Sequence, residues 1–212
     1  MKKWSWVACL LLLPSLAWAQ APIEITPRVG WQYGGTQTYS NYYGYAPGDF
    51  HANSAMNYGG TVSFALREGY ALELDYSYQK TDLLLRPNAS PAIKLGDLST
   101  HYIHVYGTRF VPVRPEKFDA IVMGGFGATA FSVTSFNARW LTSFGLGLGG
   151  RLYMGERLAL RVQTRFLLPI QWSNSQFYFG SGGGTVTTGG SSTLIQGDAS
   201  VGLTFMLGGG QY

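Results

Sequence analysis

The stretch that decides the fold runs from residue 72 to residue 79 and reads LELDYSYQ. Leucine or tyrosine occupies every even position, and Glu, Asp, Ser and Gln occupy the odd positions. Side chains two apart on a β-strand lie on the same face. The stretch therefore predicts a strand with one apolar face and one polar face.

Seven further segments have strand character. They cover residues 23–32, 57–66, 99–110, 118–130, 144–152, 158–168 and 198–205. Two of them, 99–110 and 118–130, are strands by composition, and their phase stays open. In 99–110, the set Tyr102, His104 and Tyr106 competes with Ile103 and Val105 for the outer face. Eight strands are predicted in all, with Pro27 expected at a bulge or a strand end because it cannot donate to a ladder.

The connections between these strands alternate in length. Three are short, at residues 67–69, 112–117 and 155–157, and four are long, at residues 34–55, 81–97, 132–141 and 169–194. Short turns at one end and long loops at the other are typical of bacterial outer-membrane barrels, in which the short turns and both termini are periplasmic. We expect an all-β fold, an eight-stranded antiparallel up-and-down transmembrane β-barrel. The strands of a soluble periplasmic barrel would also alternate between apolar and polar residues, but with the apolar face inward. This alternative therefore stays open on the alternation alone.

Composition favours the membrane alternative. Charged residues make up 12% of the chain, against about 25% in soluble domains. The polar faces carry mostly Gly, Ser, Thr, Asn and Gln, which suit a narrow barrel interior. The charged residues of the six strands with a clear phase all lie on the polar face: Glu24, Arg28, Glu73, Asp75, Arg151, Arg161, Arg165 and Asp198. A central Arg or Lys on the lipid face would cost about 2–4 kcal/mol.

These charges predict a paired network inside the barrel, because buried charges are tolerated when they are paired. We expect Glu73, Asp75, Arg151 and Arg161 at its centre, with further members nearby: Glu24, Arg28 and Arg165. Its expected role is structural rather than catalytic.

The N-terminus predicts a cleaved signal peptide over residues 1–19, followed by the barrel domain over residues 20–212. Lys2 and Lys3 precede the apolar run 7–13, and Ala17-Trp18-Ala19 forms a small-x-small cleavage site. Cys9 lies in this leader, so we expect no disulfide in the mature chain. The chain has 15 Lys and Arg against 11 Asp and Glu, and two of the lysines are in the leader. The remaining excess is too small to indicate a nucleic-acid partner.

Two motifs have a weaker interpretation as sites. Gly145, Gly147 and Gly150 match G-x-G-x-x-G, but they lie within an alternating strand rather than between a strand and a helix. His101 and His104 would face opposite sides of a strand, which disfavours a metal pair. We expect no cofactor and no metal.

The chain resembles the small outer-membrane β-barrel family that includes the OmpA, OmpX and OmpW types. The matching stretches are ITPRVGW at 25–31, LELDYS at 72–77, GGFG at 124–127, FGLG at 144–147 and VGLTF at 201–205. The resemblance implies outer-membrane lipid and lipopolysaccharide as surroundings. It also implies the barrel-assembly machinery as a partner during biogenesis, with Phe205 or Tyr212 as the aromatic assembly signal.

Three functions remain open from the sequence. The first is a structural, surface-interaction or adhesion-type role, with an extracellular ligand bound by the aromatic loops 34–55 and 169–194. The second is a narrow channel for small or hydrophobic solutes. The third is an enzyme that modifies lipid A, for which the histidines are the candidate bases: His51, His101 and His104. We expect the first, and no enzyme.

Overall fold

The computed structural model describes residues 22–39, 48–87, 91–133, 138–170, 175–180, 183–188, 191–193 and 196–207. The expected signal peptide and Tyr212 lie outside these residues. Within the described part, no helix is long and apolar enough to cross a membrane.

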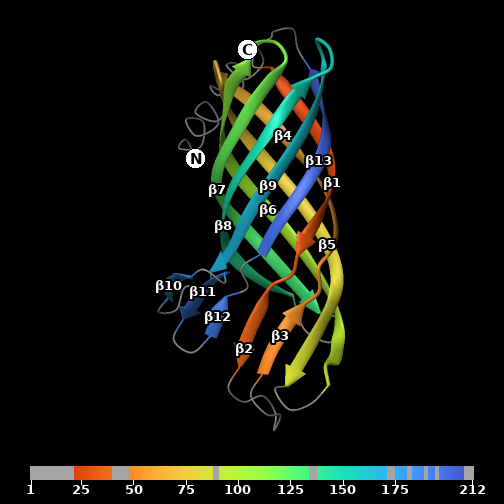
Figure 1. Cartoon of the computed structure of the whole chain (residues 1–212), viewed down its shortest axis with the longest axis vertical. Coiled ribbons are helices and arrows are strands. Elements are labelled where there is room, and N and C mark those ends of the chain that lie inside the picture. The colour runs from red at the N-terminus through yellow and green to blue at the C-terminus, as the bar shows by residue number, and fades with distance from the viewer. Residues whose placement is uncertain are drawn as a thin grey trace, which may run out of the picture.

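Eight antiparallel strands close into a ring (Figure 1). They are β1 (Ile23–Tyr33), β4 (Ala55–Arg67), β5 (Tyr70–Pro87), β6 (Ile93–Arg114), β7 (Phe118–Val133), β8 (Arg139–Tyr153), β9 (Leu158–Ile170) and β13 (Gln196–Leu207). Around the ring the order is β5-β4-β1-β13-β9-β8-β7-β6, and pairing of β6 with β5 closes it. The predicted ring of eight antiparallel strands is confirmed.

The open phase of the fourth and fifth strands is settled by burial. Tyr102, His104 and Tyr106 point into the barrel, while Ile103 and Val105 point outward. In β7 the inward side chains near the short turn are Asp119, Ile121 and Met123. This inner face mixes apolar with polar residues, which is why alternation of polarity gave no clear phase there.

The long connections are partly strand, which corrects the expectation of loops. In 34–55, β2 (Thr36–Tyr39) pairs with β3 (Gly48–Ala52), and β3 pairs with the far part of β5. In 81–97, β5 continues through Pro87 and β6 begins at Ile93. In 169–194, β10 (Ser175–Gly180), β11 (Gly183–Thr188) and β12 (Ser191–Thr193) form a separate three-stranded sheet. A register shift between Leu83 and Leu84 breaks the alternation, so the continuing strand resembles a loop in the sequence.

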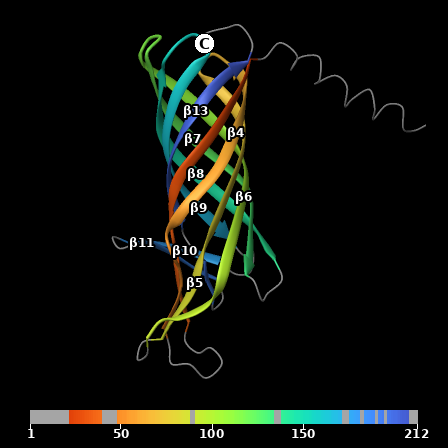
Figure 2. The same cartoon turned by 90° about the vertical axis from the view of Figure 1, so that its right-hand side faces the viewer.

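We call β2, β3, residues 81–87 of β5 and residues 93–98 of β6 the extension. Figures 1 and 2 show it projecting from the barrel at the end opposite the short turns. We call the other end of the barrel, where the short turns lie, the short-turn end; Ile23 of β1 and Leu207 of β13 are paired there. β6 has 22 residues, whereas about 9–11 suffice for a spanning strand. The extension is therefore surplus to what a membrane span requires.

The outward face of the barrel is an apolar belt. Its exposed members include Val105, Leu146, Leu148, Val162, Phe166, Val201 and Leu203. On β5 the outward face is apolar from Tyr70 up to Lys80. Ten residues at about 3.3 Å each, tilted by about 40°, give a height near 25 Å, which is the apolar band of outer-membrane barrels. Such a large exposed apolar surface is typical of lipid contact.

Pro27 lies in the middle of β1, which corrects the expectation of a bulge or a strand end. Ile25 lies opposite Phe205 and Arg28 opposite Gly202, so the register is unchanged across the proline. The β1–β13 ladder is interrupted at residues 26 and 27 instead. The missing N–H therefore removes pairing locally, without an inserted residue.

Candidate functional site: the charged interior

The centre of the bore holds two arginines and two aspartates. Arg28 Nη2 donates to Asp75 Oδ1 at 2.9 Å, and Arg165 Nη1 donates to the same oxygen at 2.5 Å. Arg165 Nε also donates to Asp198 Oδ1 at 3.0 Å. Thr61 Oγ1 donates to Asp75 Oδ2 at 2.8 Å. All these side chains are buried, and each carboxylate has a cationic partner, as a charge inside a protein requires.

A second ion pair lies closer to the short-turn end, with Glu73 two residues from Asp75 along β5. Arg161 binds Glu73 in a bidentate geometry, with Nη1–Oε1 at 2.7 Å and Nη2–Oε2 at 2.9 Å. Ser63 donates to Glu73 at 2.9 Å, and Arg161 Nε donates to Gln163 at 2.7 Å. The planar guanidinium matches the carboxylate, which makes this type of pair strong and specific in direction.

A third cluster lies nearest the short turns. Arg151 Nη1 donates to Glu24 Oε1 at 2.8 Å, and Arg151 Nη2 donates to Asp119 Oδ2 at 3.0 Å. Tyr153 donates to the same Asp119 oxygen at 2.7 Å. The guanidinium carbon also stands 4.0 Å from the centre of the Phe110 ring. Asp119 is absent from the set that sequence reasoning proposed, because the phase of its strand was open.

The three clusters cross the bore. Glu73 on β5 and Arg161 on β9 come from strands separated by β4, β1 and β13 in the ring. Glu24 on β1 and Arg151 on β8 are separated by β13 and β9. The structure thus places all seven sequence-proposed residues inside the barrel and brings them together in three separate groups rather than one network. Salt bridges between non-adjacent strands thus lie across the barrel interior.

A buried serine and a buried histidine contact each other inside the bore. Ser143 Oγ lies 2.7 Å from His104 Nε2, and Thr129 Oγ1 donates to Ser143 Oγ at 2.9 Å. His104 Nδ1 has no hydrogen-bond partner within the described residues. The ring stacks near Tyr102 and Tyr106, with centroids 6.0 and 5.5 Å away. A catalytic histidine is usually oriented by a third group on its other nitrogen, and the described residues supply none here.

The other two histidines lie elsewhere. His101 Nδ1 lies 3.0 Å from the Tyr76 hydroxyl on the outward face. His51 Nδ1 lies 3.0 Å from Thr36 Oγ1 in the extension, where partial burial lowers its pKa. Among the described residues, no group of three His, Cys, Asp or Glu could hold a metal ion.

Two glycines of the G-x-G-x-x-G match, Gly145 and Gly150, make room for aromatic side chains. A Cβ at Gly145 would lie 2.2 Å from the Tyr106 hydroxyl, and one at Gly150 would lie 2.8 Å from the Phe118 ring. The match runs along β8 and leads to no helix, so its context differs from that of a dinucleotide-binding turn.

The expected assembly signal is described in part. Phe205 lies on β13, faces outward and is opposite Ile25 of β1 and Leu158 of β9. It occupies an ordinary lipid-facing position near the end of the last strand.

The extension and the adjoining Lys80 carry an exposed group of four charges. Lys94 Nζ lies 2.7 Å from Asp82 Oδ1 and 2.9 Å from Asp97 Oδ1, and Lys80 Nζ lies 3.2 Å from Asp97 Oδ2. Hydrogen bonds from Lys94 and Lys80 lower the pKa of Asp97. Asp82 and Asp97 are directly opposite on β5 and β6, so the lysines offset a repulsion between like charges.

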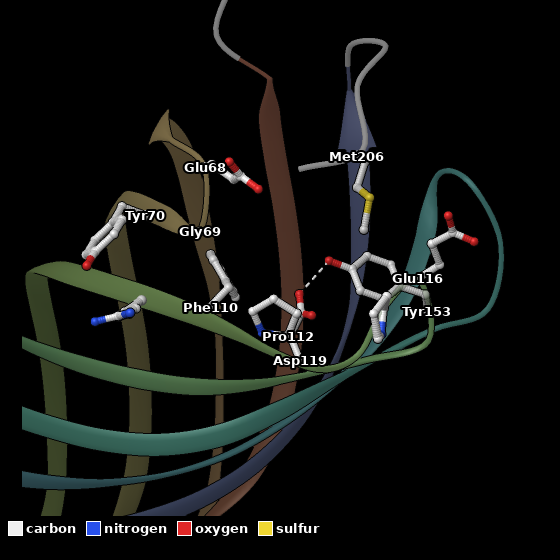
Figure 3. A pocket seen from close by; sticks show the side chains of 11 residues that line it. Glu68, Gly69, Tyr70, Phe110, Pro112, Glu116, Asp119, Tyr153 and Met206 are labelled. Carbon is white, nitrogen blue, oxygen red and sulfur yellow. Dashed lines mark hydrogen bonds between the residues drawn. The ribbon is translucent and has the colours of Figure 1, made fainter.

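A cavity of about 500 Å³ opens at the short-turn end. Figure 3 shows Tyr70 on one side of it, Tyr153 on the other, and Phe110 and Asp119 between them. The remaining lining residues come from the turns and strand ends: Glu68, Gly69, Arg109, Pro112, Pro115, Glu116 and Met206. The third ion cluster forms the inner wall of this cavity through Asp119.

No family model matches the sequence, and no curated protein matches it. Solved structures with the same fold include Neisserial surface protein A, with a TM-score of 0.52, 9% identity and coverage of 85% of this chain and 96% of that one. The outer membrane protein OprG from Pseudomonas aeruginosa has a TM-score of 0.61 and 10% identity, and the match covers 90% of this chain and 97% of that one. The outer membrane protein AlkL, solved in lipid bilayers, has a TM-score of 0.57 and 12% identity, and the match covers 91% of this chain and 93% of that one. The predicted resemblance to small outer-membrane β-barrels is confirmed at the level of the fold.

Proposed function

We propose that this small outer-membrane β-barrel is a closed anchor in the bacterial outer membrane, and that its extension contacts partners outside the cell. The orientation follows from the rule that short turns of such barrels are periplasmic. The short-turn end then lies in the periplasm together with Ile23 of β1 and Leu207 of β13, and the extension is extracellular. The role is of the surface-interaction or adhesion type.

The observation that carries this proposal is the set of ion pairs across the bore. An eight-stranded barrel is just wide enough for side chains to fill its interior. Here the Glu73–Arg161 and Glu24–Arg151 pairs join strands on different sides of the ring. A solute moving along the axis would have to separate buried charges, and that leaves each of them uncompensated.

The purified protein, reconstituted in planar bilayers, is expected to give no discrete conductance steps at neutral pH. The reason is the obstruction by the three clusters. Glu73→Gln serves as the diagnostic variant, since it changes a charge inside the bore. Regular conductance steps in the wild type, with an ion selectivity that Glu73→Gln alters, would place an ion path through the bore. The narrow-channel alternative would then replace the closed anchor.

The extension supports the second half of the proposal. Its strands lie side by side in the order β2-β3-β5-β6 and continue the barrel wall beyond the apolar belt. β1 and β2 are separated by residues 34 and 35, and β3 and β4 by residues 53 and 54. The β2–β3 hairpin therefore continues the barrel wall outward. This places a broad surface away from the lipid.

Deletion of residues 36–52 removes β2 and β3 and leaves Gly34, Gly35, Asn53 and Ser54 as a turn. We expect the variant to remain a heat-modifiable outer-membrane barrel but to lose adhesion of expressing cells to host-cell or abiotic surfaces. The matched control is Glu156→Ser in a short turn, which should keep adhesion. Equal adhesion of the deletion variant and the wild type would contradict the role of the extension.

We propose that the Ser143–His104 pair is structural. The pair is enclosed in the bore, where a lipid substrate would have to displace Tyr102 or Tyr106. His104→Ala is therefore included in the adhesion comparison, with the lipid A of each strain analysed by mass spectrometry. A lipid A modification present with the wild type and lost with His104→Ala would favour the enzyme instead.

A further inference from the structure

Two arginines share one tyrosine ring at the short-turn end. The guanidinium carbon of Arg67 lies 4.4 Å from the centre of the Tyr70 ring, and that of Arg109 lies 5.2 Å from it. Tyr70 is directly opposite both residues, Arg67 on β4 and Arg109 on β6. Both arginines are exposed. An aromatic face attracts a cation, so the ring holds the two guanidinium groups at one place on the barrel wall.

This place is on the outward face, next to the apolar belt. Tyr70 shares its face of β5 with Leu72 and Leu74, and Arg109 shares its face of β6 with Val105. In the proposed location, these outward residues contact the acyl chains of the membrane. Tyr70 and the two arginines therefore lie at the level of the lipid headgroups, where amphipathic rings are favoured.

The two cations lack an acidic partner. Among the described residues, neither Arg67 nor Arg109 forms an ion pair. At the other end of the same strand pair, Lys80 and Lys94 are both paired with aspartates. Two like charges gathered at one ring repel each other, and an anion between them offsets this repulsion. At the extension two aspartates supply that anion. Here Glu68 and Glu116 line the same cavity, but among the described residues neither forms an ion pair with Arg67 or Arg109.

The cavity at the short-turn end also fits an amphipathic ligand. Tyr70 and Arg109 line the cavity of about 500 Å³ at the short-turn end. Figure 3 shows Phe110, Pro112 and Met206 farther along the same cavity. A ligand that contacts the arginines thus has lipid on one side and a partly apolar recess on the other.

We propose that Arg67, Tyr70 and Arg109 form a binding site for the phosphate of an anionic phospholipid in the periplasmic leaflet. Arginine donates to phosphate oxygens through a planar fork of N–H groups. The tyrosine orients both forks and faces the glycerol region. This site goes beyond the proposed anchor role and rests on the proposed outer-membrane location and orientation.

The test measures lipid retention by native mass spectrometry of the full chain in detergent, with equal amounts of phosphatidylglycerol and phosphatidylcholine added. We expect the wild type to retain phosphatidylglycerol preferentially. Arg67→Gln/Arg109→Gln should retain about tenfold less, as expected for the loss of hydrogen bonds to a charged group. Tyr70→Leu keeps both charges and should lose part of the preference, because the forks are no longer held. Lys80→Gln/Lys94→Gln, at the other end, should behave as the wild type.

Heat modifiability of each variant on SDS gels separates the possible failures. If the wild type gives no heat-modifiable band in the outer-membrane fraction, the proposed location fails first. If all variants are folded and the double glutamine variant retains phosphatidylglycerol as well as the wild type, the phospholipid site is wrong. Displacement of the lipid by millimolar inorganic phosphate would also overturn it, because the site would then select the free anion.

Discussion

Replacing Arg165 with methionine is expected to lower the free energy of unfolding of the barrel by about 3–5 kcal/mol. Arg165 binds both Asp75 and Asp198 at the centre of the bore. Asp75 keeps Arg28 in the variant, but Asp198 loses Arg165 and, among the described residues, keeps a side-chain hydrogen bond from Asn57 at 3.0 Å. The cost is that of an uncompensated buried carboxylate, and urea unfolding in lipid vesicles, followed by tryptophan fluorescence, measures it.

Two controls isolate the cause of this loss. Arg165→Met/Asp198→Asn removes both members of the pair and should recover much of the stability, because replacing a whole buried pair is often nearly neutral. Lys94→Met breaks two ion pairs in the exposed extension and should leave the unfolding transition unchanged. A loss below about 1 kcal/mol for Arg165→Met would mean that water reaches the centre of the bore and that the ion pairs do not close it.

The alternation of 72–79 was enough to predict which side chains share a face, because strand geometry fixes side-chain direction with a period of two. The low charge content of the chain then assigned the polar face to the bore. It could not predict which charges pair. Glu73 meets Arg161 and Asp75 meets Arg165, and these partners depend on how far each strand is shifted around the closed ring. The set of interior charges is thus a local property of each strand, and the pairing is a property of the barrel.

Asp119 and the aromatic column of β6 show a second limit. Tyr106 is large, yet it points inward because glycines face it. The Cβ of a side chain at Gly125 would lie 2.8 Å from the Tyr106 backbone, and that of a side chain at Gly145 would meet its hydroxyl. Such complementarity joins residues on three strands and leaves no trace in the pattern of one. The extension was missed for a related reason, since the register shift beside Leu84 interrupts the alternation although the strand continues.

Replacing Leu146 with arginine is expected to destabilise the barrel by about 2–4 kcal/mol, which is the cost of an arginine on the lipid face at the midplane. Leu146 lies near the middle of β8, faces outward and is 59% exposed.

Val113→Arg is the matched control, because Val113 is similarly exposed, at 58%, but lies beside the turn between β6 and β7. There an arginine reaches the headgroups, and the expected cost falls to about 0–1 kcal/mol. Urea unfolding in vesicles and the abundance of each variant in the outer-membrane fraction measure the difference. In water, both positions would accept arginine with little change. A clear loss at Leu146 together with tolerance at Val113 therefore reports the depth of lipid around the barrel, and equal tolerance at both would mean that the apolar belt does not lie in a membrane.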